Sequence, residues 1–163
     1  VDGRPDVLTF QSAPLDHDLT IAGNVVAKLW ASTTGTDADW VVKLIDVFPD
    51  SGVDRPLMRG YQLMISGEIM RGRYRTSFEK PAPIAANAVL PYTVDLHQQA
   101  YTVRKGHRLM VQIQSTWFPL YDRNPQTFVP NVFTARASDY RSQLHRVWHA
   151  PGRATHIEID VAR

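Results

Sequence analysis

The sequence of 163 residues is long enough for one domain with a substantial core and short for two. Its 18 Lys and Arg residues, against 16 Asp and Glu residues, give a formal charge of +2 with no block of one sign, so neither nucleic acid nor an anionic membrane is expected as a partner. The absence of cysteine excludes disulfides, thiolate nucleophiles and cysteine-based zinc sites, and no apolar run reaches the roughly 18 residues that span a bilayer.

Strand periodicity dominates the chain. Apolar and polar residues alternate with a period of two in successive segments, which predicts strands with one face in a core. In chain order, the expected strands cover residues 7–11, 21–32, 40–48, 61–69, 90–96, 101–104, 109–115, 144–149 and 157–161. Residues 40–48 are apolar on both faces apart from Lys43 and Asp46, which is typical of a central strand covered on both sides.

The segments between these strands are rich in turn residues and prolines, and no stretch of a dozen residues has a helical period. One short helix is expected around residues 70–77, where the alternation stops. Many short strands without a βαβ rhythm predict an all-β fold, an antiparallel jelly-roll β-sandwich, with residues 1–163 as a single domain. Its core should contain Leu44, Ile65, Leu109, Val111, Ile113, Ile157 and Ile159.

The common catalytic motifs are missing from the sequence. No serine has glycine at both second neighbours, as a nucleophile elbow requires, and there is no phosphate-binding glycine-rich loop and no HExxH pair. We therefore expect no catalytic residue, no cofactor-binding residue and no metal ligand in this chain.

The histidines and one group of acids are the remaining candidates for chemistry. On an extended strand, His145 and His149 would lie about 13 Å apart, too far to share a metal ion, so we expect a surface or interface role. His107 follows Gly106 at the start of a strand and is expected to bond nearby backbone. The acids are Asp37, Asp39, Asp46, Asp50 and Asp54. Such oxygen-rich loops can hold Ca²⁺, but turn-forming Asp residues that bond their own backbone are the favoured interpretation.

The most unusual segment is the proline-bounded run of residues 117–125. It places three aromatic side chains and a leucine in an otherwise polar loop, where the preceding strand cannot bury them all. Trp, Tyr and Arg are enriched at protein interfaces, so we expect a domain interface. The predicted interface residues are Trp117, Phe118, Tyr121, Asp122 and Arg123. The competing hypothesis is a platform that stacks on a sugar ring.

Three segments together resemble a known family: residues 36–50 (TDADWVVKLIDVFPD), 67–75 and 106–115 (GHRLMVQIQS). The sequence is similar there to the C-terminal domain of serine hydrolases of the X-Pro dipeptidyl-peptidase and cocaine esterase type. Residues 117–126, followed by 130–133, resemble most the branch of α-amino acid ester hydrolases and glutaryl-7-aminocephalosporanic acid acylases.

The resemblance implies a three-part parent enzyme: an α/β-hydrolase core with a Ser-Asp-His triad, a helical cap, and this jelly-roll, whose shape is like that of galactose-binding domains. None of the triad residues maps onto this sequence. The implied role is a non-catalytic domain that packs on the α/β-hydrolase core of the same parent chain and shapes the approach to its active site. The alternative is a stand-alone carbohydrate-binding module.

The N-terminus carries neither an initiating Met nor a signal-like region, which predicts a piece of a longer chain. The sequence does not fix the compartment of the bacterial parent, for which a periplasmic or secreted location is one option, and any homo-oligomer should assemble through the parent.

Overall fold

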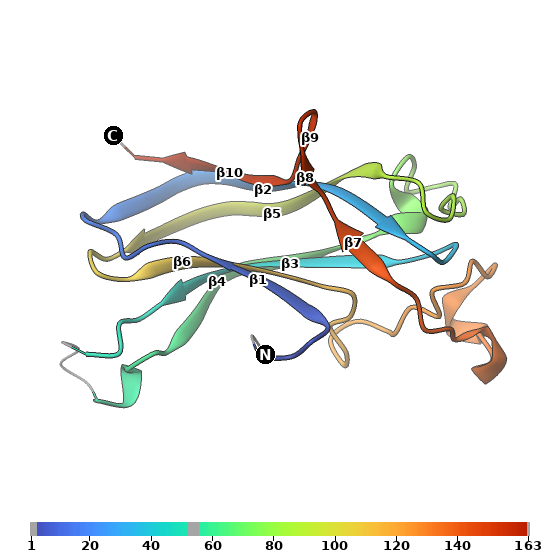
Figure 1. Cartoon of the computed structure of the whole chain (residues 1–163), viewed down its shortest axis with the longest axis horizontal. Coiled ribbons are helices and arrows are strands. Elements are labelled where there is room, and N and C mark those ends of the chain that lie inside the picture. Colours follow the sequence, from blue (N-terminus) through green and yellow to red (C-terminus); the bar gives the residue numbers. More distant parts are fainter. Residues whose placement is uncertain (1–2, 52–55, 163) are drawn as a thin grey trace.

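Two antiparallel four-stranded sheets stack on each other in the computed structural model, which describes residues 3–51 and 56–162. The first sheet, called sheet A, has the order β1 (Val7–Gln11), β6 (Arg108–Gln114), β3 (Asp39–Val47) and β4 (Gln62–Arg71). Sheet B has the order β10 (His156–Val161), β2 (Leu19–Thr33) and β5 (Leu90–Val103), with β7 (His145–Val147) paired to the far end of β2. Figure 1 shows the two layers, and the chain crosses between them repeatedly, as in a jelly-roll. The predicted all-β sandwich is confirmed.

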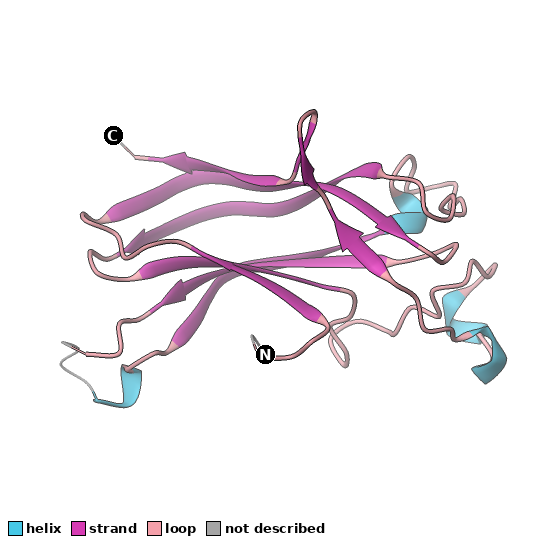
Figure 2. Ribbon diagram, in the orientation of Figure 1, coloured by secondary structure: helices cyan, strands magenta, loops and turns pink. Residues whose placement is uncertain are grey.

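The remaining regular structure is short. Strands β8 (His149–Ala150) and β9 (Arg153–Ala154) form a small hairpin above β2 and β10 (Figure 2). Four 3₁₀ turns lie in the connections of the described part of the chain. These turns cover Pro56–Met58, Gly72–Tyr74, Val132–Thr134 and Ala137–Asp139. None of the helices among the described residues has the length and apolar character needed to cross a membrane.

The core lies between the two sheets, where the period-two pattern places it. Leu44 and Ile113 are buried there, together with the ring of Trp40, whose centroid lies 5.4 Å from that of Tyr92. The other five predicted core residues, Ile65, Leu109, Val111, Ile157 and Ile159, pack against this cluster but are only partly buried. Ile65 lies on β4 and Ile157 and Ile159 lie on β10, which are edge strands, while Val111 lines a hollow of about 180 Å³.

Strand β3 is central in sheet A, as its two-sided apolar pattern predicts. It pairs with β6 on one side and β4 on the other, and all nine of its residues are buried, Lys43 and Asp46 included. Ile45 and Val47 form a second small cluster with Met110 of the neighbouring strand.

Three predicted boundaries are wrong. Residues 90–96 and 101–104 belong to one strand, β5, and the alternation breaks because His97 has a φ of 64° where the pairing register with β2 shifts. The helix expected at residues 70–77 is a single 3₁₀ turn, Gly72–Tyr74, because β4 extends to Arg71. The predicted strand at residues 144–149 divides into β7 and β8, which Trp148 separates.

His107 belongs to a hydrogen-bonded group that joins the two sheets at one end of the core. Its Nδ1 lies 2.8 Å from Oδ1 of Asp46, and the hydroxyl of Tyr101 on β5 donates to Oδ2 of the same carboxylate at 2.7 Å. The ring of Phe48 packs on the imidazole, with centroids 4.4 Å apart. The structural role predicted for His107 is confirmed, but its partner is a buried carboxylate rather than backbone.

Candidate functional site

The connection between β6 and β7, residues 115–144, is far longer than a jelly-roll turn needs and contains only two 3₁₀ turns. Long ordered loops of this kind usually carry function. It covers one end of the sandwich (Figure 1) and contains all five predicted interface residues. How the sandwich holds this loop therefore determines which of its side chains remain exposed.

A buried ion pair fixes the middle of the loop. Nε of Arg73 donates to Oδ2 of Asp37 at 2.8 Å, and both residues are almost fully buried. The same guanidinium donates to the carbonyl oxygen of Val129 at 2.7 Å and stacks on the ring of Phe128, 4.7 Å from its centroid. Asp37 also accepts from the backbone N–H of Ala38, as a turn-forming Asp would. The predicted turn role describes only part of what this carboxylate does.

Asp39 fixes the first half of the loop. Its Oδ1 accepts from Nδ2 of Asn124 at 2.8 Å, and its Oδ2 lies 3.8 Å from Nε of Arg71. Arg71 donates in turn to the carbonyl oxygen of Asp122 at 3.2 Å. Burial raises the pKa of Asp39 to about 6, because the hydrogen bond from Asn124 and the nearby Arg71 only partly offset the loss of water.

Three of the five acids considered as a cation site have separate protein partners. Asp37 and Asp39 bind arginines, Asp46 binds His107 and Tyr101, and Asp54 lies outside the described residues. In the described part of the chain, no three His, Cys, Asp or Glu side chains are grouped so that they could hold a metal ion.

Trp117 packs on the outer face of sheet A, rather than at an edge of the sandwich. Nζ of Lys43 lies 4.4 Å from the centroid of its ring, and burial lowers the pKa of this lysine. Gly67 of β4 makes room for the ring, since a Cβ there would be 2.9 Å from Cη2 of Trp117. Nearby, the hydroxyl of Tyr121 donates to Oε1 of Glu68 at 2.9 Å. Trp117 and Tyr121 are thus tied to the sandwich and only partly exposed.

Other loop side chains point away from the sandwich. Phe118 is 55% exposed and Phe133 is 77% exposed, and both line a shallow hollow of about 290 Å³ with Arg123 and Tyr140. The guanidinium of Arg123 lies 4.5 Å from the centroid of the Phe118 ring. Asp122 is held through its backbone carbonyl, which accepts from Arg71. We call Phe118, Arg123, Phe133 and Tyr140 the loop patch.

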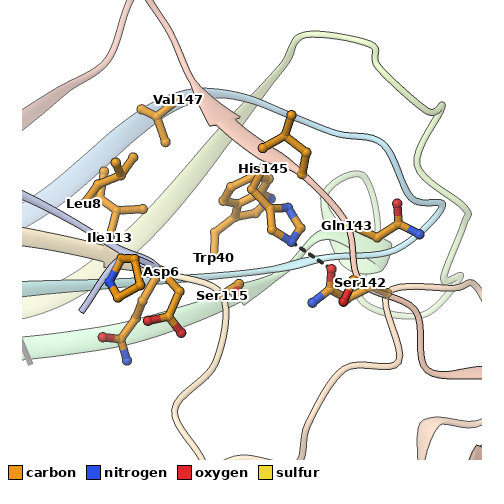
Figure 3. A pocket seen from close by; sticks show the side chains of 13 residues that line it. Asp6, Leu8, Trp40, Ile113, Ser115, Ser142, Gln143, His145 and Val147 are labelled. Atoms are coloured by element: carbon orange, nitrogen blue, oxygen red, sulfur yellow. Dashed lines mark hydrogen bonds between the residues drawn. The ribbon is translucent and has the colours of Figure 1, made fainter.

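A larger cavity of about 410 Å³ opens where the last part of the loop meets β1 and β7. Figure 3 shows the ring of His145 beside that of Trp40, with Leu8, Ile113 and Val147 on one side and Ser142 and Gln143 at the rim. The two rings meet edge to face, with centroids 5.2 Å apart. Nε2 of His145 lies 2.9 Å from Oε1 of Gln126, and burial lowers the pKa of the imidazole.

The two histidines considered as a pair have separate surroundings. His145 lines the cavity, whereas His149 packs against Phe10 of β1, with ring centroids 5.5 Å apart. Sequence reasoning missed the cavity and the buried Asp–Arg pairs, because their members are far apart in the chain. Among the hydrogen bonds of the described residues, none joins a serine hydroxyl to a histidine ring.

Comparison with known proteins gives a consistent result. The family described as the X-Pro dipeptidyl-peptidase C-terminal non-catalytic domain matches residues 1–158. The crystal structure of an aminopeptidase from a marine sediment Thaumarchaeota archaeon is 50% identical, with a TM-score of 0.97 over 99% of this chain and 27% of that chain. An α-amino acid ester hydrolase is also 50% identical, with a TM-score of 0.96 over 99% of this chain and 26% of that chain. The cocaine esterase of Rhodococcus sp. (strain MB1 Bresler) is 29% identical over the full chain and 27% of its own length. The chain thus spans about a quarter of the length of these relatives, each of which carries the domain within a larger hydrolase.

Proposed function

The chain belongs to the family of X-Pro dipeptidyl-peptidase C-terminal non-catalytic domains, and from this premise we propose that it docks onto the α/β-hydrolase core of a serine hydrolase and shapes the approach to the active site of that core. The relatives support this proposal, since the domain occupies about a quarter of each of their chains. The catalytic serine and its base would then belong to the rest of the parent.

The loop patch is the observation that carries the docking proposal. Solvent-exposed aromatic side chains that line one hollow are unusual on a free surface, and rings with an arginine are enriched at the centres of interfaces. The loop is held on the sandwich by buried contacts at Asp37 and Asp39, so the patch is presented on a rigid support. A preorganised surface loses little conformational entropy on docking.

The patch supports docking better than sugar binding. A ring that stacks on a sugar needs a free face, and the guanidinium of Arg123 already lies over the ring of Phe118. Arg123 can instead keep hydrogen-bonding groups for a protein partner, because a guanidinium has five N–H donors.

For the parent, we propose acyl transfer through an activated serine, with amino acid esters or amino-terminal peptide bonds as the substrate class. The aminopeptidase and the α-amino acid ester hydrolase support this class by their 50% identity with the chain. Acylase activity, which the resemblance to the acylase branch implies, and assembly of any homo-oligomer through the parent stay predictions from the sequence.

The test is the double substitution Phe118→Ala with Phe133→Ala in the full-length parent. Both rings are exposed in this chain, so the isolated domain should keep its unfolding free energy. In the parent, loss of two buried rings should weaken docking by roughly 3–6 kcal/mol. We expect reduced activity, or cleavage by added protease at the domain junction.

Phe78→Ala is the matched control, because Phe78 is 79% exposed, packs on Tyr74 and does not line the hollow of the loop patch. A second test is the double variant Trp117→Ala with Tyr121→Ala in the parent. Because these side chains contact Lys43 and Glu68, this variant should also lose some stability. A parent whose activity and protease resistance are unchanged by the Phe118 and Phe133 substitutions would exclude this docking surface.

A further inference from the structure

A lysine without a charged partner lies on the outer face of sheet A. Lys43 is the middle residue of β3, and its neighbours Val42 and Leu44 face the core, so its side chain points to the opposite face of the sheet. Its cross-strand neighbours are Gly67 of β4 and Gln112 of β6, neither of which is charged. Lys43 is only 9% exposed, and within the described part of the chain its ammonium group forms no ion pair and no hydrogen bond.

An aromatic ring lies against this ammonium group, and a hollow opens beside both. Nζ of Lys43 is 4.4 Å from the centroid of the Trp117 ring. A ring attracts a cation, but it does not replace the hydrogen bonds that the three N–H groups make in water. Burial accordingly lowers the pKa of Lys43. Lys43 and Trp117 both line a hollow of about 210 Å³, together with Arg4, Asp6, Val7, Gln114, Thr116 and Phe118.

The charges that line the hollow do not balance. The cations are Lys43 and Arg4, and the one acid is Asp6. Nε and Nη2 of Arg4 donate to the two carboxylate oxygens of Asp6, which leaves Lys43 without a partner. If Asp6 turned to Lys43 instead, Arg4 would lose its partner, so one positive charge is left over in either case. Because a nearly buried charge is rarely left unpaired, the hollow calls for an anion from outside these residues.

The size and the position of the hollow indicate what kind of anion it receives. Its volume of about 210 Å³ is below the roughly 300–1,000 Å³ that is usual for small-molecule pockets, so it suits the carboxylate end of one side chain better than a substrate-sized ligand. Phe118 lines both this hollow and the hollow of the loop patch. A protein surface that docks on the loop patch would therefore cover Lys43 as well, and can supply the carboxylate.

We propose that the α/β-hydrolase core of the parent inserts one acidic side chain, Asp or Glu, into this hollow and pairs its carboxylate with Lys43. The inference rests on the docking proposed above and adds to it the chemistry of one contact. The ring of Trp117 and the docked surface exclude water from the pair, which strengthens the attraction. The pair also fixes how the two domains dock, because an arrangement without the acid leaves Lys43 buried and unpaired.

The first experiment couples Lys43 to its partner in the full-length parent. A water-soluble carbodiimide joins an amine to a carboxylate that is in direct contact with it, and mass spectrometry of the digested product identifies both residues. We expect an amide between Nζ of Lys43 and an Asp or Glu of the hydrolase core. An amide to a carboxylate within the 163 residues would overturn the proposal, because the charge would then be balanced inside this chain.

The variant Lys43→Met measures the effect of the contact, since methionine keeps an apolar stem beside Trp117 and removes the charge. In the parent, it should speed cleavage by added protease at the domain junction by about ten-fold, because one partner of a buried charge pair is lost. In the 163-residue chain, the urea midpoint should not fall, because a buried charge without a partner contributes little stability there. An unchanged rate of cleavage at the junction would overturn the proposal, whether or not the midpoint falls.

Lys105→Met is the matched control. Lys105 is exposed in the turn before β6, whereas Trp117 follows β6 at the other end of the sandwich (Figure 1), so this variant should leave cleavage unchanged. The variant Phe118→Ala with Phe133→Ala tests docking through the loop patch by itself. If it loosens the junction and Lys43→Met does not, the ion pair is wrong and docking stands. If only Lys43→Met loosens the junction, the ion pair stands and the loop patch is wrong.

Discussion

Replacing Arg73 by methionine should destabilise the chain strongly, because it leaves the carboxylate of Asp37 buried without its charged partner. Asp37 has no exposed surface and Arg73 is only 2% exposed. The variant removes the 2.8 Å bond to Oδ2 of Asp37 and the 2.7 Å bond to the carbonyl oxygen of Val129, while the bond from the N–H of Ala38 to Asp37 remains. Breaking a buried ion pair from one side costs about 3–5 kcal/mol.

The assay is equilibrium unfolding in urea, with a thermal melt as a second measurement. A loss of that size should lower the melting temperature by roughly 6–20 °C in a domain of this length. Because Val129 also loses its donor, added protease should cut near residues 122–130 before the sandwich unfolds.

The double variant Asp37→Asn with Arg73→Met distinguishes two causes of destabilisation, the unpaired buried charge and the lost packing of the arginine side chain. With no charge left in the interior, the double variant should be more stable than Arg73→Met alone. Arg4→Met, which breaks the exposed pair with Asp6, is the control and should change nothing measurable. The reasoning is refuted if Arg73→Met costs less than about 1 kcal/mol, or if adding Asp37→Asn makes it worse.

Three other changes follow from the packing and the charges. Gly67→Ala should push the ring of Trp117 away from Lys43 and cost roughly 1–3 kcal/mol, seen as a shifted indole N–H resonance; an unmoved resonance would contradict this. The pKa of about 6 for Asp39 lies above its unfolded value near 4, so its contribution to stability is fully present below pH 4 and falls by about 3 kcal/mol as the pH rises to 6. The Asp39→Asn variant should not show this loss of stability. If the difference in unfolding free energy between the wild type and the variant stays constant between pH 4 and pH 7, the prediction is wrong. Leu44→Ala should cost about 2–5 kcal/mol in urea unfolding, since Leu44 is completely buried between the sheets; a loss below 1 kcal/mol would mean the core is elsewhere.

The alternation of side chains predicted most of the sandwich, because a strand with one buried face repeats every two residues wherever it lies in a sheet. The two-sided apolar run around Leu44 even placed β3 at the centre of its sheet. The alternation gave a wrong strand boundary where the backbone departs from ideal strand geometry. The positive φ of His97 sits where the register of β5 against β2 shifts, so one strand had the appearance of two.

The candidate site was predicted only in part. The sequence of residues 117–125 indicated an aromatic surface, since so many rings cannot be buried by one short loop. It did not indicate which rings face outward. Trp117 packs on Lys43 and Gly67, while Phe118, the next residue, is exposed. The interface role of these residues remains a prediction. The sequence did not show that the backbone of Asp122 would bind Arg71 or that Arg123 would lie over the ring of Phe118.

By itself, the sequence determined the fold class, the family resemblance and the strand faces, because each of these depends on patterns of residues that are close in the chain. Only the tertiary structure decided the partners of the buried charges. Asp37 and Arg73 are 36 residues apart, and Asp39 and Asn124 are 85 residues apart, so no local pattern connects them. The cavity beside His145 has the same origin, since its walls meet only when β1, β3, β6 and β7 pack together. A polar side chain shows its type in the sequence, but its partner depends on which distant strand the fold brings to it.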